Sequence, residues 1–156
     1  MPSIPTYHSI VKKNIVTGFR GVDDHDYAAL ADHFAPDLRH RFAGQHALGG
    51  QRHDAVAVLA WLERVGRVLP DLTFAITDVT VAGWPHDTTV VARWNAHATL
   101  ADSGEPYRNR GVHVVRLRWF AIVDMDVHLD TDVLRSALER QAAAGIDEAT
   151  ATPITS

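Results

Sequence analysis

Residues 107–130 read YRNRGVHVVRLRWFAIVDMDVHLD, and the alternation of side chains in this stretch decides the fold. Two runs with a period of two, at 107–118 and 122–130, predict β-strands, because successive side chains of a strand point to opposite faces. The short link between the two runs favours consecutive antiparallel strands. One face of the pair is charged, and the other is mainly apolar.

The charged face carries an arginine row beside an aspartate row. The row consists of Arg108, Arg110, Arg116 and Arg118 on the first strand and Asp124, Asp126 and Asp130 on the second. Opposite charges on neighbouring strands form cross-strand ion pairs that face water. We therefore interpret the acidic run as an ion-pair ladder and not as a metal site.

The opposite face points inward and begins with polar residues. Tyr107, Asn109 and His113 lie on the first strand, beside the apolar set Val123, Met125, Val127 and Leu129 on the second. Buried polar groups cost free energy unless they find partners, and ligand pockets combine apolar walls with a few polar groups. The pattern predicts a pocket. The alternative is that Tyr107 and Asn109 lie at an exposed strand end while His113 bonds a backbone carbonyl group.

The remaining periodicity predicts helices first and strands afterwards. Helices are expected at residues 7–21, 26–34, 54–69 and from 131 or 132 to 145, and strands at 38–42, 72–83 and 88–100, with Asp26 and Asp54 as helix caps. We expect the second helix to be closed by Pro36. This order predicts an α+β fold whose helices cover one face of a curved sheet.

Length and composition indicate one ordinary globular domain. The 156 residues have a net charge of −4 and no cysteine, which excludes a disulfide framework and argues against a nucleic-acid-binding protein. No apolar run is long enough to cross a membrane and no secretory signal is visible, so we expect a cytoplasmic protein and no membrane partner. We expect an N-terminal arm at 1–6, the domain at 7–145 and a flexible tail at 146–156.

Short segments in a fixed order give the chain a family resemblance. They are His33–Asp37, Leu69–Phe74, Asp78–Val79, Gly83–Trp84, Tyr107–Leu117 and Leu129–Thr131. Over residues 7–145 the chain resembles the NTF2-like superfamily, particularly its SnoaL-like and ketosteroid-isomerase-like branch. The resemblance implies a cone, in which a strongly curved antiparallel sheet wraps on three N-terminal helices, plus a C-terminal helix. It also implies a deep apolar pocket and a homodimer formed through the sheet.

The family's catalytic residues are absent or replaced at the matching positions. His113 stands where the steroid isomerases carry a protonated acid that donates to an oxyanion. Their carboxylate base falls near Phe42 and their helix tyrosine near Gly18, and the aspartate of SnoaL-type cyclases and limonene-type epoxide hydrolases falls at Val127. A shift of one residue that turned Asp126 inward would expose its apolar neighbours, and we disfavour it.

The candidate site follows from the inward face and the resemblance. We expect His113 to be a general acid–base, with Asn109 and Tyr107 holding a carbonyl oxygen. The expected substrate-binding residues are His40, Phe42, His46, Trp61, Trp94, Met125, Val127 and Leu129. Solvated loop histidines and plain core packing of the tryptophans are the alternatives. No metal and no cofactor are expected, because no histidine pair has the spacing of a helical zinc site.

The function predicted from the sequence is a cofactor-free acid–base enzyme of the isomerase, cyclase or dehydratase type. Its ligand would be a small apolar carbonyl compound bound in a deep hydrophobic pocket. One alternative is a non-catalytic module for small-molecule binding or dimerisation. A further alternative is an epoxide hydrolase, which needs an inward carboxylate, and only Asp78 qualifies if its strand contains a bulge.

Overall fold

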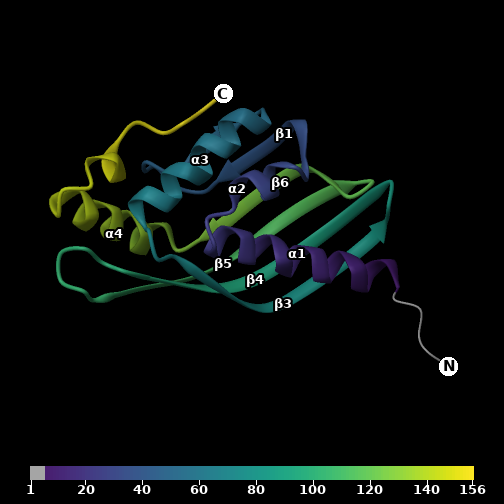
Figure 1. Ribbon diagram of the computed structural model, residues 1–156, viewed down its shortest axis with the longest axis horizontal. Helices are drawn as coiled ribbons and strands as arrows, with labels where there is room; N and C mark the ends of the chain where they lie inside the picture. Colours follow the sequence, from purple (N-terminus) through teal and green to yellow (C-terminus); the bar gives the residue numbers. More distant parts are fainter. Residues whose placement is uncertain (1–5) are drawn as a thin grey trace.

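The computed structural model describes residues 6–156, so most of the expected arm at 1–6 lies outside the described residues. The helices are α1 (Tyr7–Asp23), α2 (Tyr27–Ala31), α3 (Ala55–Val68), α4 (Thr131–Ala143) and the 3₁₀ helix η1 (Asp147–Thr150). The strands are β1 (Phe34–Phe42), β2 (Gly50–Arg52), β3 (Thr73–Trp84), β4 (Asp87–Thr99), β5 (Pro106–Arg118) and β6 (Ala121–Leu129). The chain is α+β, as predicted (Figure 1).

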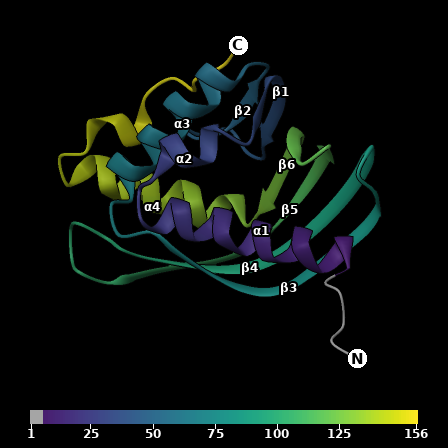
Figure 2. The ribbon, with the colours of Figure 1, turned by 45° about the vertical axis from the view of Figure 1, so that its right-hand side comes forward.

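The strands form one curved sheet in the order β2-β1-β6-β5-β4-β3. Figure 2 shows the long strands β3, β4 and β5 bending beneath α1, with α2 and α3 above the same face. The curved sheet and the helices on its concave face agree with the cone that the resemblance implies. One detail differs, since β1 pairs with β6 in parallel while the other pairs are antiparallel. The segment from α3 to β5 separates β1 from β6 in the chain, so no hairpin forces them to be antiparallel.

The second helix is shorter than its sequence pattern predicts. α2 ends at Ala31, and β1 begins at Phe34 and runs through Pro36. The register of β1 against β6 shifts between Phe34 and Arg39. Proline supplies no backbone donor and is tolerated in such irregular parts of a strand. Pro36 therefore lies inside a bulged strand and does not close a helix.

The predicted caps of the second and third helices are confirmed. The Asp26 carboxylate accepts from the backbone N–H of Ala29, and the Asp54 carboxylate accepts from that of Ala57. The last helix was expected to begin at residue 131 or 132, with Thr131 or Asp132 as its cap; it begins at Thr131, and its capping residue is Asp130. Each carboxylate accepts a hydrogen bond from a first-turn N–H group that has no partner within the helix.

A bulge at the start of β6 changes which side chains face inward. Leu117 pairs with Ile122 while Arg116 pairs with Asp124, so Val123 is the extra residue. From Asp124 onward the expected alternation holds, with Met125 opposite Val115 and Val127 opposite His113. The expectation that Val123 points inward is wrong, and Ile122 takes its place in the wall of the interior.

The aspartates of β6 form their ion pairs with β1 and not with β5. Asp124 accepts from Arg39 and Arg41, and Asp126 accepts from Arg41. The predicted partner Arg116 pairs instead with Asp87, the first residue of β4. The ladder exists on the outer face, but its arginines come from the neighbouring parallel strand.

The last residues pack along α3 and β2. Glu148 in η1 pairs with Arg64 and Arg67 of α3, and the hydroxyl group of Ser156 accepts from the backbone N–H of His53. These contacts cover the segment expected to be a flexible tail. Within residues 6–156, none of the helices has both the length and the apolar composition needed to cross a membrane.

Candidate functional site

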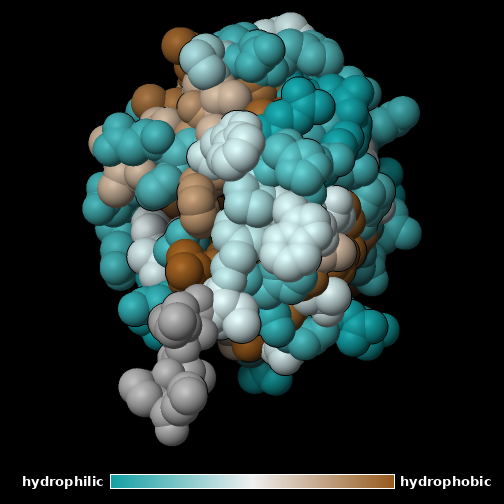
Figure 3. All heavy atoms as spheres, turned by 90° about the vertical axis from the view of Figure 1, so that its right-hand side faces the viewer, coloured by the Kyte–Doolittle hydropathy of each residue, from teal (hydrophilic) through white to brown (hydrophobic). Residues whose placement is uncertain are grey.

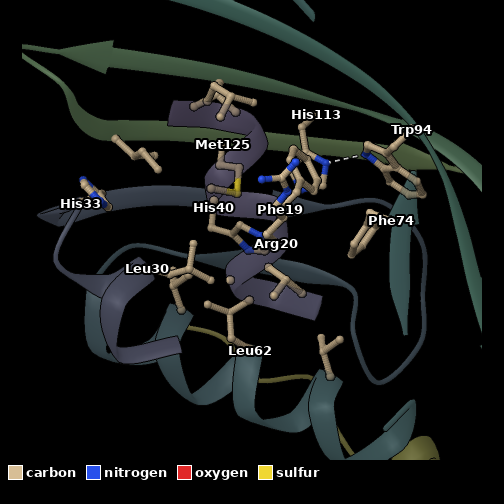
Figure 4. A pocket seen from close by; sticks show the side chains of 18 of the residues that line it. Phe19, Arg20, Leu30, His33, His40, Leu62, Phe74, Trp94, His113 and Met125 are labelled. Carbon is tan, nitrogen blue, oxygen red and sulfur yellow. Dashed lines mark hydrogen bonds between the residues drawn. The ribbon is translucent and has the colours of Figure 1, made fainter. Parts of the chain in front are cut away.

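A cavity of about 570 Å³ lies between the concave face of the sheet and helices α1, α2 and α3 (Figure 4). Its walls are largely apolar and come from every layer of the fold. They include Phe19, Leu30, Leu62, Phe74, Trp94 and Met125. Pockets of roughly 300–1,000 Å³ with such walls are typical of small-molecule sites. The cavity therefore has the size and the lining that a small-molecule site requires.

Exposed polar residues surround the entrance of the cavity. They are Asn14, Thr17 and Arg20 on α1, Asp24 and Asp26 between α1 and α2, and His33 before β1. The carboxylate of Asp26 already caps α2. Among the described lining residues, carboxylates occur only at this entrance. No acidic side chain of residues 6–156 therefore lines the interior, where it could act as a buried base.

His113 extends from β5 into the cavity and makes one side-chain hydrogen bond among the described residues. The indole Nε1–H of Trp94 donates to its Nδ1 over 2.7 Å (Figure 4). The ring of Phe19 meets the imidazole edge-on, with the two centroids 4.9 Å apart. Burial among these groups disfavours the charged form and lowers the pKa of His113 to about 3. The ring is neutral at physiological pH.

Gly111 makes room for the indole that holds His113. A Cβ atom at position 111 would lie 2.6 Å from the ring of Trp94 and 2.6 Å from the backbone oxygen of His128. Real side chains do not approach this closely. The glycine therefore permits Trp94 to lie against β5, where its N–H reaches His113.

His40 extends into the same cavity from β1 and is paired with a buried arginine. Arg52, its neighbour across the β1–β2 ladder, donates from Nη1 to His40 Nδ1 over 2.9 Å. His40 is 1% exposed, and its Nε2 has no hydrogen-bond partner within residues 6–156. Burial, and then the charge of Arg52, lowers the pKa of His40 well below its ordinary value. This imidazole is also neutral.

The two hydrogen bonds fix the same tautomer in both histidines. Since Nδ1 accepts a hydrogen bond in each ring, the proton of the neutral imidazole lies on Nε2. His40 and His113 are close enough for the charge of one to disfavour protonation of the other. Figure 4 shows both side chains on the same side of the cavity, next to Met125. The two rings thus present two Nε2–H donors for which residues 6–156 supply no acceptor.

This tautomer changes the role expected of His113. A general base needs a free lone pair, but the only lone pair on the ring accepts from Trp94. A neutral imidazole with an N–H directed at a carbonyl oxygen acts instead as an electrophile that stabilises negative charge. The geometry therefore makes His113 a hydrogen-bond donor to a ligand.

Asn109 and Tyr107 form a buried network beside the start of α4. The Asn109 amide donates to the Tyr107 hydroxyl over 2.8 Å and to the backbone oxygen of Asp130 over 3.0 Å. Its carbonyl oxygen accepts from the backbone N–H groups of Arg110 and Asp130. Tyr107 lines the cavity, and burial raises its pKa to about 12. Asn109 is not among the described lining residues and connects β5 to α4.

The other expected binding residues divide into two groups. His40, Phe42, Trp61, Trp94, Met125 and Leu129 line the cavity. His46 and Val127 are not among the described lining residues. His46 holds its own loop, because its Nε2 bonds to the carbonyl oxygen of Ala43 and its Nδ1 accepts from the N–H of Leu48. Val127 is fully buried in the core.

The β3 bulge that decides the orientation of Asp78 is present, but it turns the carboxylate outward. The register of β3 against β4 shifts between Ile76 and Asp78. Asp78 then lies opposite the exposed Arg93 in that register, on the outer face of the sheet. The epoxide-hydrolase alternative therefore lacks the inward carboxylate on which it depended.

Sequence reasoning did not single out Arg52, which contacts His40 at the cavity wall. β2 has only three residues, so the sequence shows no readable period there. The residue is completely buried, which a charged side chain rarely is unless it serves a partner. Its position opposite His40 depends on strand pairing that no local pattern reveals.

Comparison with solved structures identifies the same fold in several proteins. A candidate isomerase from Bacillus subtilis has a TM-score of 0.68 at 15% identity, covering 82% of this chain and 91% of its own. A candidate SnoaL-like polyketide cyclase from Shewanella putrefaciens has a TM-score of 0.64 at 16% identity, with coverages of 80% and 82%. TerC, co-crystallised with polyporic acid, has a TM-score of 0.64 at 19% identity, with coverages of 81% and 96%.

Sequence comparisons give the family. A search of curated proteins finds no match. The family model of the SnoaL-like domain matches residues 16–125, which include the C-terminal part of α1, most of the cavity-lining residues and most of the sheet. The chain belongs to the SnoaL-like domain family.

Proposed function

We propose that this protein binds a small, largely apolar carbonyl compound in its cavity and promotes enolisation of that compound. Enolisation is the step that isomerisation, cyclisation and dehydration next to a carbonyl group have in common. The observation that carries the proposal is the pair of neutral imidazoles, His40 and His113, whose Nε2–H groups meet no acceptor among the described residues. Preorganised neutral donors of this kind stabilise the oxyanion that develops in the transition state.

The step assigns a definite fate to each electron pair and proton. The C–H bond next to the carbonyl breaks, its electron pair becomes the enolate, and the negative charge moves to the oxygen held by His40 and His113. The proton passes to solvent at the entrance, because neither imidazole has a free lone pair. Return of a proton to the same or another carbon, or attack of the enolate on a second carbonyl, completes the reaction.

The fold neighbours support the class of chemistry but not a particular substrate. One is a candidate isomerase and another a candidate polyketide cyclase. A third neighbour, TerC, was co-crystallised with polyporic acid. The apolar walls around the two histidines favour a ligand with one polar end and an apolar body.

The experiment uses 2-tetralone, an apolar bicyclic ketone, labelled with ¹³C at its carbonyl carbon. Binding is measured by the downfield shift of the carbonyl signal on hydrogen bonding, and enolisation by exchange of the α protons in D₂O. We expect both a shift and exchange faster than in buffer. His113→Asn, which retains an acceptor for Trp94 but removes the Nε2–H, should slow the exchange by about 100-fold and reduce the carbonyl shift. The control is His97→Asn, on the exposed face of β4.

A second candidate function is binding without chemistry. The absence of a buried carboxylate among the described lining residues favours it, because a protein base would otherwise be expected beside the substrate. A carbonyl shift without accelerated exchange would establish this alternative. If 2-tetralone and related ketones do not bind, both functions are refuted.

A further inference from the structure

Arg52 is a buried cation without an acidic partner among the described residues. It is 0% exposed, and none of the ion pairs of residues 6–156 includes it. Its guanidinium group donates to His40 and to the carbonyl oxygens of Gly49 and Leu48, and its Nε has no partner. Burial of an ionised side chain is costly unless a negative charge compensates it.

The surroundings of Arg52 do not supply that negative charge. Its carbon Cζ lies 5.3 Å from the ring centroid of Trp61, a weak cation–π contact. Burial, together with the nearby charge of Arg64, lowers the pKa of Arg52 to about 10, so the guanidinium remains charged at neutral pH. The protein has therefore placed an uncompensated positive charge beside the cavity.

His40 connects this charge to the cavity. The guanidinium donates to Nδ1 on one side of the ring, and the unpartnered Nε2–H lies on the other side. When Nδ1 of an imidazole accepts a hydrogen bond from a cation, the ring is polarised and its Nε2–H becomes a stronger hydrogen-bond donor. The other ionisable groups around the cavity are the neutral His113 and Tyr107 and, at the entrance, Arg20, Asp24, Asp26 and His33.

We infer that Arg52, acting through His40, makes the cavity select ligands that carry an acidic hydroxyl group and bind as oxyanions, such as phenols and enolised 1,3-dicarbonyl compounds. The oxyanion would accept from His40 Nε2 and supply the negative charge that Arg52 lacks. This inference rests on the proposed function, since it assigns the ligand class of the same cavity. In it Arg52 is a positioning residue, because it acts on the ligand only through the imidazole.

The test uses 4-nitrophenol, whose neutral and ionised forms absorb at different wavelengths, so that the pKa of the bound probe is read directly. We expect wild-type protein to lower that pKa by about one unit, which corresponds to about tenfold preference for the phenolate over the phenol. In Arg52→Met the shift should vanish, while binding of neutral 2-tetralone changes much less. A general loss of ligand binding would instead weaken the binding of both 4-nitrophenol and 2-tetralone.

Two further variants keep the test decisive. Arg41→Met is the matched control, because Arg41 lies on the adjacent strand but pairs with aspartates on the outer face, and it should behave as wild type. His40→Asn keeps an acceptor for Arg52 but removes the Nε2–H, so it should also abolish the shift, even if Arg52→Met does not fold.

The outcomes separate this inference from the proposed function. If wild type binds 4-nitrophenol without a change in its pKa, or if a folded Arg52→Met retains the shift, the inference is overturned while ketone binding can persist. If neither 4-nitrophenol nor 2-tetralone binds, the proposed function falls together with it.

Discussion

Acidification should destabilise this protein because His113 is neutral in the folded chain. Its pKa is about 3 in the folded state, against 6.5 for an unperturbed histidine. Between these values the unfolded chain binds a proton that the folded chain does not, so the free energy of unfolding rises with pH across this range. The contribution is present above about pH 6.5 and is lost as the pH falls toward the folded-state pKa.

The expected size follows from linkage. Between about pH 7.5 and about pH 5, His113 alone should reduce the free energy of unfolding by about 2 kcal/mol, since each pH unit below the unfolded pKa costs about 1.4 kcal/mol. This is a large share of the ~5–15 kcal/mol by which domains are commonly stable. His40 acts in the same direction, because its pKa is also lowered by burial and by Arg52.

The assay is urea unfolding followed by far-UV circular dichroism over this pH range. Comparison with His113→Asn isolates the titration, because the amide oxygen still accepts from Trp94 but the side chain binds no proton. We expect the variant to lose about 2 kcal/mol less than wild type on acidification. His97→Asn, with an exposed histidine removed, should keep the wild-type slope. Equal slopes for wild type and His113→Asn would refute the buried, neutral imidazole.

Three further substitutions test other parts of the structure. Trp119 and Phe120 form the β5–β6 turn with φ of 50° and 68°, which non-glycine residues rarely adopt. Replacing the pair by Asn-Gly should therefore raise the free energy of unfolding, measured by urea titration, by about 1–2 kcal/mol. An unchanged free energy of unfolding would show that the turn is unstrained. Asn109→Ala should lower the free energy of unfolding by about 1–3 kcal/mol, because the hydrogen bonds of the Asn109 side chain go to other protein groups. Binding of 2-tetralone should stay unchanged, and a loss of that binding would contradict the structural role of Asn109. Gly111→Ala should displace the Trp94 ring. We expect weaker ketone binding, measured by the carbonyl signal, and lower stability, measured by thermal unfolding. Unchanged binding would mean that the indole is not needed to hold His113.

The Trp119–Phe120 turn lies at the end of the molecule where the strand turns meet the start of α1. Figure 3 views this end and shows apolar and weakly polar residues among the hydrophilic ones. Trp84 and Trp119 are 63% and 71% exposed, and Phe120 both lines the cavity and packs edge-on against Tyr7. The strained turn thus forms part of the cavity wall, which gives a physical reason for bulky residues where glycine or asparagine would be easier.

Strand parity could be predicted from the sequence because one face of the sheet is buried. The alternation of β5 and of β6 from Asp124 onward places His113 and Met125 inward, and no shift by one residue satisfies both faces. The bulge at Val123 could not be predicted in this way. An extra residue preserves the hydrophobic pattern on each side of itself, so Val123 and Ile122 are equally acceptable inward residues in the sequence.

The chemistry of the cavity was less predictable than its location, because residue type does not determine the role of a histidine. His113 and His40 are each compatible with a base, an acid or a donor until the partner of Nδ1 is known. Those partners, Trp94 and Arg52, come from neighbouring strands and are set by pairing register. Where a residue on the neighbouring strand leaves Nδ1 free, the same imidazole on the same fold regains a lone pair for proton transfer. A change in a single cross-strand partner is therefore enough to convert a donor site into an acid–base site without altering the cone.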